Sequence, residues 1–258
     1  MPSVSEEKLR EEIARFCGLI YEKGYVASTD GNVSVRLSDG NIMCTPTMSN
    51  KGFVKPADMV VIDIKGKKIK GERKQSSEMA MHLLIYEMRP DTHAVVHAHP
   101  PCATAYAAAG IPLNKALISE VVLALGCIPL AEYGTPGTPE LTNQLRPFVQ
   151  NFDALLMANH GVVTYGANLE DAFNRMDTVE HFAKISIYTK ILGRERLLSS
   201  EDVEKLWVQR QKYYGLESSE GAKPKDPMCP LTDAVSETIS ITRNELIDLI
   251  ERVVSNLK

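Results

Sequence analysis

The sequence has no run of about 20 consecutive apolar residues, which is the length that a membrane-spanning helix requires. It also has no excess of basic residues, because 29 lysines and arginines stand against 33 aspartates and glutamates and give a formal net charge of −4. These two absences speak against a membrane-spanning protein and against a protein that binds nucleic acid. The lysine-rich segment 65–74 is interrupted by glycines and a glutamate. We expect an exposed hairpin tip there rather than a binding surface.

Cysteine is scarce. The five cysteines are odd in number, scattered along the chain and without a C-x-x-C pair. The first ten residues are polar, unlike the apolar core of a secretory signal peptide. Both features favour a location in the reducing cytoplasm.

Apolar periodicity predicts alternating helices and strands. Helices are expected at 5–24, 76–87 and 169–192. Strands are expected at 33–37, 42–44, 60–64, 94–97, 128–130, 154–157 and 162–165. The turn Asp39-Gly40 joins the strands at 33–37 and 42–44 as a hairpin, and the strand at 60–64 enters a second hairpin at the turn Lys65-Gly66. Hairpins between flanking helices predict an α/β fold of three layers, α/β/α, around a mixed, largely antiparallel sheet, and not a purely parallel doubly wound fold.

The composition changes near the C-terminus. With 258 residues, 44% of them hydrophobic, the chain is long enough for one full core. Segment 217–230 is rich in Ser, Gly, Lys and Pro, as in a linker, and leads to Thr242-Arg243-Asn244-Glu245, a capping box that opens an amphipathic helix. We therefore divide the chain into a domain at 1–216 and a linker plus C-terminal helix at 217–258. Docking of this helix on its own domain and contact with another subunit both stay open.

Three histidines stand at the ends of expected buried strands. His97 and His99 are separated by one residue, and such residues project to the same face of a strand, so both imidazoles can reach one ion. His160 follows the apolar run 154–158 and can complete a site that leaves an open position for substrate, as a catalytic zinc needs. The alternative is three unrelated polar residues near strand ends.

Five motifs, in this order, identify a family. They are Gly31-Asn32-Val33-Ser34, Thr45-Pro46-Thr47, Ser76-Ser77-Glu78, Val95-Val96-His97-Ala98-His99 and Asn159-His160-Gly161. Over residues 6–216 the chain resembles the class II aldolase/adducin family, and within it the fuculose-phosphate aldolases. The resemblance implies one divalent metal ion per chain, held by His97, His99 and His160, with Zn²⁺ expected first and Mn²⁺ or Co²⁺ as alternatives. It also implies a catalytic Glu78, and a homotetramer with active sites between subunits.

The resemblance assigns the substrate phosphate to Asn32, Thr47, Ser76 and Ser77. The residues themselves agree, because the free N–H groups and the dipole at the start of the expected helix favour an anion beside Ser76 and Ser77. The same side chains can equally serve as caps and turn formers. Glu78 is expected in the first helical turn, placed to exchange a proton with the substrate, although a glutamate is also ordinary at a helix start.

Three further histidines lie outside the motifs. His82 follows Glu78 by four residues on the same helical face. Because the ion already has three ligands, we expect His82 to pack against the site or to support it. His93 and His181 are expected in surface or structural roles.

Two positions depart from the fuculose-phosphate aldolases. Met48 stands where these have a glycine after Thr47, so its side chain is expected to narrow the phosphate pocket or to move the loop. Tyr214 matches one of two family tyrosines that handle protons or position the substrate, whereas the other falls on Glu120. Buried near the metal, Glu120 can act as a second base, accept a substrate hydroxyl or contact a subunit. The alternative is an exposed glutamate at a helix start.

The expected function is that of a metal-dependent aldolase. Such a lyase cleaves a ketose 1-phosphate into dihydroxyacetone phosphate and an aldehyde through a metal-stabilised enediolate. Sugar-phosphate epimerases, dehydratases and decarboxylases on the same scaffold stay open, as does a non-catalytic, adducin-like interaction module. Glutamate rather than aspartate at position 78 favours the aldolase over the epimerase, and the intact three-histidine set speaks against the module.

Overall fold

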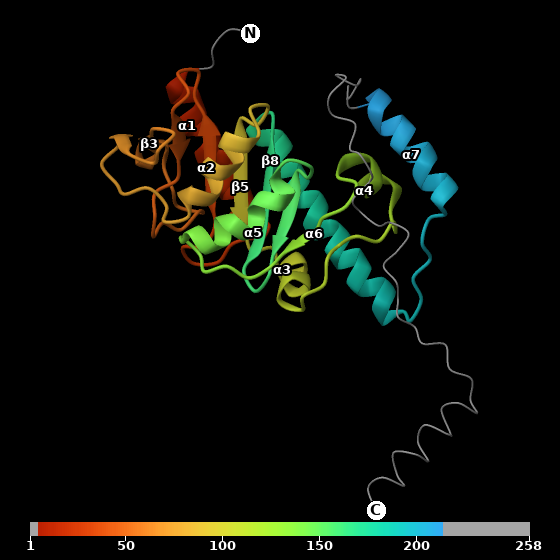
Figure 1. Cartoon of the computed structure of the whole chain (residues 1–258). Coiled ribbons are helices and arrows are strands. Elements are labelled where there is room, and N and C mark those ends of the chain that lie inside the picture. Colours follow the sequence, from red (N-terminus) through yellow and green to blue (C-terminus); the bar gives the residue numbers. More distant parts are fainter. Residues whose placement is uncertain (1–4, 214–258) are drawn as a thin grey trace, which may run out of the picture.

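The computed structural model describes residues 5–213 (Figure 1). Tyr214 and the expected linker and helix at 217–258 lie outside these residues. The helices are α1 (Glu6–Glu22), α2 (Met79–Met88), α3 (Pro101–Ala108), α4 (Ser119–Ala124), α5 (Pro139–Val149), α6 (Leu169–Ile191), α7 (Ser200–Tyr213) and the 3-10 turn η1 (Pro56–Asp58). The strands are β1 (Asn32–Arg36), β2 (Ile42–Cys44), β3 (Val60–Ile62), β4 (Lys68–Lys70), β5 (Ala94–Ala98), β6 (Leu130–Ala131), β7 (Ala154–Met157) and β8 (Gly161–Gly166). Among the described helices, none is both long and apolar enough to cross a membrane.

The strands form one mixed sheet in the order β4-β3-β2-β1-β5-β8-β7-β6. Neighbouring strands are antiparallel, except that β6 runs parallel to β7. The largely antiparallel sheet and its two hairpins are thereby confirmed, and β4 is exposed as expected of a hairpin tip. The strand expected at 128–130 is displaced, because Ile128 makes only an isolated bridge with Leu113 and β6 begins at Leu130.

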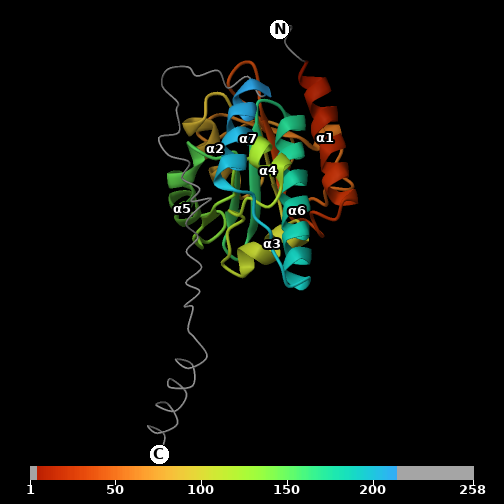
Figure 2. The same ribbon diagram turned by 90° about the vertical axis from the view of Figure 1, so that its right-hand side faces the viewer.

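Helices cover both faces of this sheet, with α1 and α6 on one side and α2 and α5 on the other (Figure 2). Successive strand residues point to opposite faces. Val95 therefore packs in the core under α2 and α5, whereas Val96 packs in the core under α1, α3 and α6. The three-layer α/β/α arrangement is confirmed.

The motif segments meet at one end of the central strands β1, β5 and β8. Strand β5 ends at Ala98 beside the beginnings of β1 and β8, because it is antiparallel to both. Asn32 on β1 lies opposite His97, and the turn between β7 and β8 places His160 at the same end of the central strands. Segments far apart in the sequence therefore meet where β5 ends.

Helix α2 begins later than its sequence predicts. Its first residue is Met79 and its N-cap is Glu78, with φ −97° and ψ 12°. Ser76 is not the cap: its Oγ accepts a hydrogen bond from the Glu78 N–H, and its own N–H donates to the Thr45 carbonyl. The segment before α2 pairs with the end of β2, so the helix cannot start until this pairing ends.

Candidate metal centre

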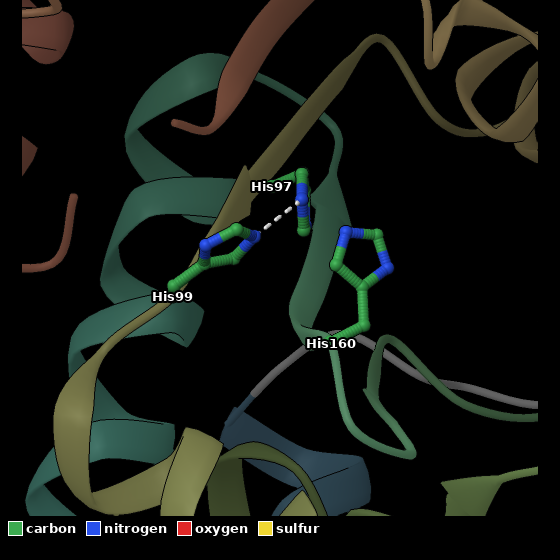
Figure 3. Close-up of side chains that lie close together, drawn as sticks. All are labelled: His97, His99 and His160. Atoms are coloured by element: carbon green, nitrogen blue, oxygen red, sulfur yellow. Dashed lines mark hydrogen bonds between the residues drawn. The ribbon is translucent and has the colours of Figure 1, made fainter. Parts of the chain in front are cut away.

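His97, His99 and His160 point toward one another (Figure 3). The Nε2 atoms of His97 and His99 lie 3.1 Å apart, and one nitrogen of each ring lies within 4.8 Å of the others. Two nitrogens bound to one tetrahedral zinc at about 2.0–2.1 Å are separated by roughly 3.3 Å. The three predicted ligands are thus at distances that suit one shared ion.

The partners of the outer ring nitrogens orient His97 and His99. The Nδ1–H of His97 donates to the Val162 carbonyl at 2.8 Å, and Nδ1 of His99 lies 3.5 Å from Oδ2 of Asp30. Burial lowers the pKa of both histidines, so each neutral ring turns an Nε2 lone pair toward the other. Two lone pairs at 3.1 Å repel unless a cation lies between them, so this donor set fits a divalent ion.

Two motif glycines permit this convergence. A Cβ at position 161 would lie 2.5 Å from Cδ2 of His99 and 2.7 Å from the Ala98 carbonyl oxygen. Gly31 has a φ of +71°, and a Cβ there would lie 2.8 Å from the His97 carbonyl oxygen. Both positions need glycine because neighbouring segments approach the end of β5 within van der Waals contact.

Glu78 projects from the start of α2 toward the histidines. Its Oε1 lies 3.1 Å from Nε2 of His160, and its Oε2 lies 3.4 Å from Nε2 of His97. Oε2 also accepts a hydrogen bond from Nδ2 of Asn32 at 2.8 Å, whereas Oε1 faces His160. Burial opposes ionisation, but the hydrogen bonds from His160 and from the Asn32 amide hold the pKa of Glu78 below its usual value. A carboxylate able to accept a proton therefore lies against the cluster.

The four positions predicted to bind phosphate are neighbours, but they are not equivalent. The Thr47 N–H donates to the Lys74 carbonyl and the Ser76 N–H to the Thr45 carbonyl, which joins the loop after β2 to the segment before α2. Ser76 is buried, Thr47 is half-buried and Ser77 is exposed. Asn32 differs, because its amide is held between Glu78 and His82. Phosphate binding at these positions stays a prediction.

Met48 does not fill the region beside Thr47. Its φ of 53° is the left-handed conformation that glycine adopts readily, and its side chain is 75% exposed. The loop therefore keeps a glycine-like path at a strain of about 1–2 kcal/mol. The side chain points into solvent in the described chain, and the effect of Met48 on phosphate binding stays a prediction.

Glu120 does not lie in the cluster. It is exposed in the first turn of α4, where its Oε2 accepts a hydrogen bond from Ser119, and α4 packs against α6 and α7. Within the single described chain Glu120 is therefore an exposed glutamate at a helix start, as the alternative reading expects, and its role in catalysis stays a prediction. The physical reason is that Val121 and Val122 occupy the buried face of this short helix and leave Glu120 on the outer one.

Sequence reasoning missed two residues at the site. Asp30 faces His99, and its position directly before the Gly31-Asn32 motif was the available signal. Lys51 is only 1% exposed, and its Nζ donates to the Ser49 carbonyl at 2.7 Å and the Thr29 carbonyl at 3.3 Å, which ties together the loops before β1 and after β2. Burial lowers the pKa of Lys51. A lysine in a polar loop gives no sequence signal of such burial.

Comparison with known proteins agrees with this geometry. Residues 11–187 match the family described as class II aldolase and adducin N-terminal domain, and the chain belongs to this family. A 3-oxo-tetronate 4-phosphate decarboxylase of Escherichia coli is 34% identical over 184 residues, or 70% of this chain and 86% of the relative. A 5-deoxy-D-ribulose 1-phosphate aldolase of Bacillus thuringiensis serovar kurstaki is 34% identical over 203 residues, or 78% of this chain and 94% of the relative.

A solved L-fuculose 1-phosphate aldolase shares the fold, with a TM-score of 0.74 and 32% identity over 80% of this chain and 97% of that one. The protein is therefore an enzyme of the class II aldolase superfamily. Class II aldolases depend on a divalent metal ion, and the three-histidine cluster suits one. These relatives cleave different phosphorylated substrates, so membership by itself does not define the reaction.

Proposed function

We propose that this protein is a metal-dependent lyase that cleaves the bond between the carbons α and β to the carbonyl of a phosphorylated sugar. The substrate is a ketose 1-phosphate, and the products are dihydroxyacetone phosphate and an aldehyde. The supporting observation is the position of Glu78, whose Oε1 lies 3.1 Å from Nε2 of His160. A base beside a three-histidine cluster is the pairing that this cleavage requires.

The chemistry divides between the cluster and the protein side chains. His97, His99 and His160 would hold a divalent ion, with Zn²⁺ proposed first, and the ion would supply Lewis-acid stabilisation of developing negative charge. Glu78 exchanges a proton with the substrate through Oε1. Asn32 keeps Oε2 of Glu78 hydrogen-bonded, so the carboxylate presents one oxygen to the reacting carbon.

The phosphate is proposed to lie at the start of α2. Thr47, Ser76 and Ser77 supply hydroxyl groups there, and the N-terminal end of α2 adds its positive dipole. Lys51 is buried in the adjoining loops and adds a positive charge to this end of the site. This arrangement favours a substrate whose phosphate dianion is several bonds away from the carbon that exchanges a proton with Glu78.

Decarboxylation is the second candidate. It is favoured by the Escherichia coli relative, which is a decarboxylase of 3-oxo-tetronate 4-phosphate. Loss of CO₂ from a 3-oxo acid and retro-aldol cleavage both break the bond between the carbons α and β to a ketone and leave an enolate-type anion, so one site can catalyse either reaction. Glutamate rather than aspartate at position 78 supports a lyase over an epimerase.

The test compares both substrate classes on one preparation. The Zn²⁺-loaded protein is incubated with dihydroxyacetone phosphate and a set of small aldehydes, and formation of ketose phosphate is followed. In parallel, the release of CO₂ from 3-oxo-tetronate 4-phosphate is measured. We expect aldol addition to be faster. CO₂ release without aldol addition assigns the decarboxylase, and no turnover in either assay contradicts the proposed lyase.

Replacing Ser76 and Ser77 together with alanine tests the anion site. We expect KM for a phosphorylated substrate to rise by roughly tenfold to a hundredfold, because two hydrogen bonds are lost at about 0.5–1.5 kcal/mol each. KM for the unphosphorylated analogue should change little. Initial rates with both substrates measure the difference, and equal effects on the two would place the phosphate elsewhere.

We further propose a homotetramer in which Tyr214 acts across a subunit boundary. Exposure of Glu120 on α4 supports a contact with another subunit rather than with the metal of the same chain. A mixture of inactive Tyr214→Phe and Glu78→Gln proteins should recover part of the activity, because some hybrid sites receive one intact copy of each residue. Light scattering establishes the assembly. A fully active monomer, or exchanging subunits without recovery, contradicts this arrangement.

A further inference from the structure

We infer that His82 positions the catalytic base, by fixing the Asn32 amide so that Oε1 of Glu78 is the oxygen that exchanges the proton. His82 is hydrogen-bonded to Asn32 and Ser34, and it acts on Glu78 through Asn32. The inference rests on the proposed function and names the residue that orients its base.

A continuous hydrogen-bonded chain leads from Glu78 into the protein core. Oε2 of Glu78 lies 2.8 Å from Nδ2 of Asn32, and Oδ1 of Asn32 lies 2.5 Å from Nε2 of His82. Nδ1 of His82 lies 2.7 Å from Oγ of Ser34, which lies 2.8 Å from the Tyr86 hydroxyl. We call these five residues the Glu78 relay.

Every donor in the Glu78 relay points toward Glu78. Nδ2 of Asn32 donates to Oε2 of Glu78, so Oδ1 of Asn32, which can only accept, faces Nε2 of His82. His82 must then carry its proton on Nε2. Burial lowers the pKa of His82 to about 4, so the ring is neutral and its Nδ1 accepts from Ser34. Ser34 has only one proton to donate, so the Tyr86 hydroxyl donates to Ser34.

The residue spacing on β1 and on α2 lets side chains of the Glu78 relay alternate between strand and helix. Asn32 and Ser34 are two residues apart on β1 and project to one face, whereas Glu78, His82 and Tyr86 follow a four-residue spacing along α2. Asn32, Ser34, His82 and Tyr86 are all buried. Because each link is hydrogen-bonded away from water, the network has one satisfied arrangement and holds the amide in it.

Without the His82 donor, the Asn32 amide loses its preferred orientation. If it turned over, its oxygen would face Oε2 of Glu78, and the two oxygens would repel. Glu78 would then rotate, and Oε1 would leave its place beside His160. A misplacement of about 1 Å at a catalytic group can cost roughly a hundredfold in rate.

Two substitutions of His82 separate orientation from packing. In His82→Gln, the side-chain amide can still donate to Oδ1 of Asn32, whereas in His82→Asn the shorter side chain reaches Ser34 but not Asn32. We expect kcat to fall by roughly tenfold to a hundredfold in His82→Asn and by less than about threefold in His82→Gln, with KM within about threefold of wild type in both. Bound metal should stay at one ion per chain in each. Equal loss of kcat in the two variants, or no loss in His82→Asn, overturns the inference.

The wild-type protein provides a test that needs neither turnover nor a folded variant. In metal-free protein labelled with ¹⁵N-histidine, two-bond ¹⁵N–¹H correlations should show a neutral His82 with its proton on Nε2. A proton on Nδ1 instead reverses the Glu78 relay and overturns the inference. If neither substrate class turns over, the proposed function fails, whereas the His82 tautomer still tests the relay by itself.

Discussion

The His97→Ala, His99→Ala double variant is expected to lose stoichiometric binding of a divalent ion and to lose turnover with it. The two rings supply two of the three converging nitrogens, and their Nε2 atoms lie 3.1 Å apart. His160 alone cannot retain the ion against dialysis. Lewis-acid stabilisation is worth several kcal/mol, so turnover should fall by roughly 10³-fold or more.

Elemental analysis of dialysed protein measures this loss directly. His93→Ala is the matched control, because His93 is an exposed histidine shortly before the same strand and lies outside the cluster. It should retain one ion per chain and wild-type turnover. Stoichiometric metal in the double variant would show that the ion binds elsewhere.

Glu78→Gln should retain the metal and lose most of the turnover. Glutamine has nearly the same shape and can still accept the hydrogen bond from Asn32, but it cannot take a proton. General-base catalysis contributes roughly 10²–10⁴-fold, so kcat should fall within that range. Steady-state rates and metal content on the same sample measure both parts of the prediction.

The control for this variant is Glu87→Gln, an exposed glutamate on the same helix α2. It removes one negative charge from the helix without touching the site, so kcat should not change. Near-normal turnover in Glu78→Gln would reassign the base. Loss of metal together with turnover would show that Glu78 helps to bind the ion and does not act as the proton acceptor.

The metal cluster was predictable because its signal is local. Alternation along β5 directs His97 and His99 to one face, and the apolar strand before His160 buries the third ring at the same end of the central strands. The mixed sheet was predictable for a similar reason, since turn residues between short apolar strands define hairpins. The start of α2 was not predictable from the sequence. The pairing of Ser76 with Thr45 joins segments about thirty residues apart and competes with helix formation.

The sequence by itself determined the layer architecture, the three histidines, the family and a carboxylate at the start of α2. Only the tertiary structure decided which oxygen of Glu78 faces His160. The other oxygen is held by Asn32, which meets His82 from a different element. The tertiary structure likewise decided that Glu120 is exposed, that Met48 points into solvent and that Lys51 is buried. The physical reason is that periodicity specifies the face on which a side chain lies, whereas its hydrogen-bond partners and its exposure depend on how the layers pack.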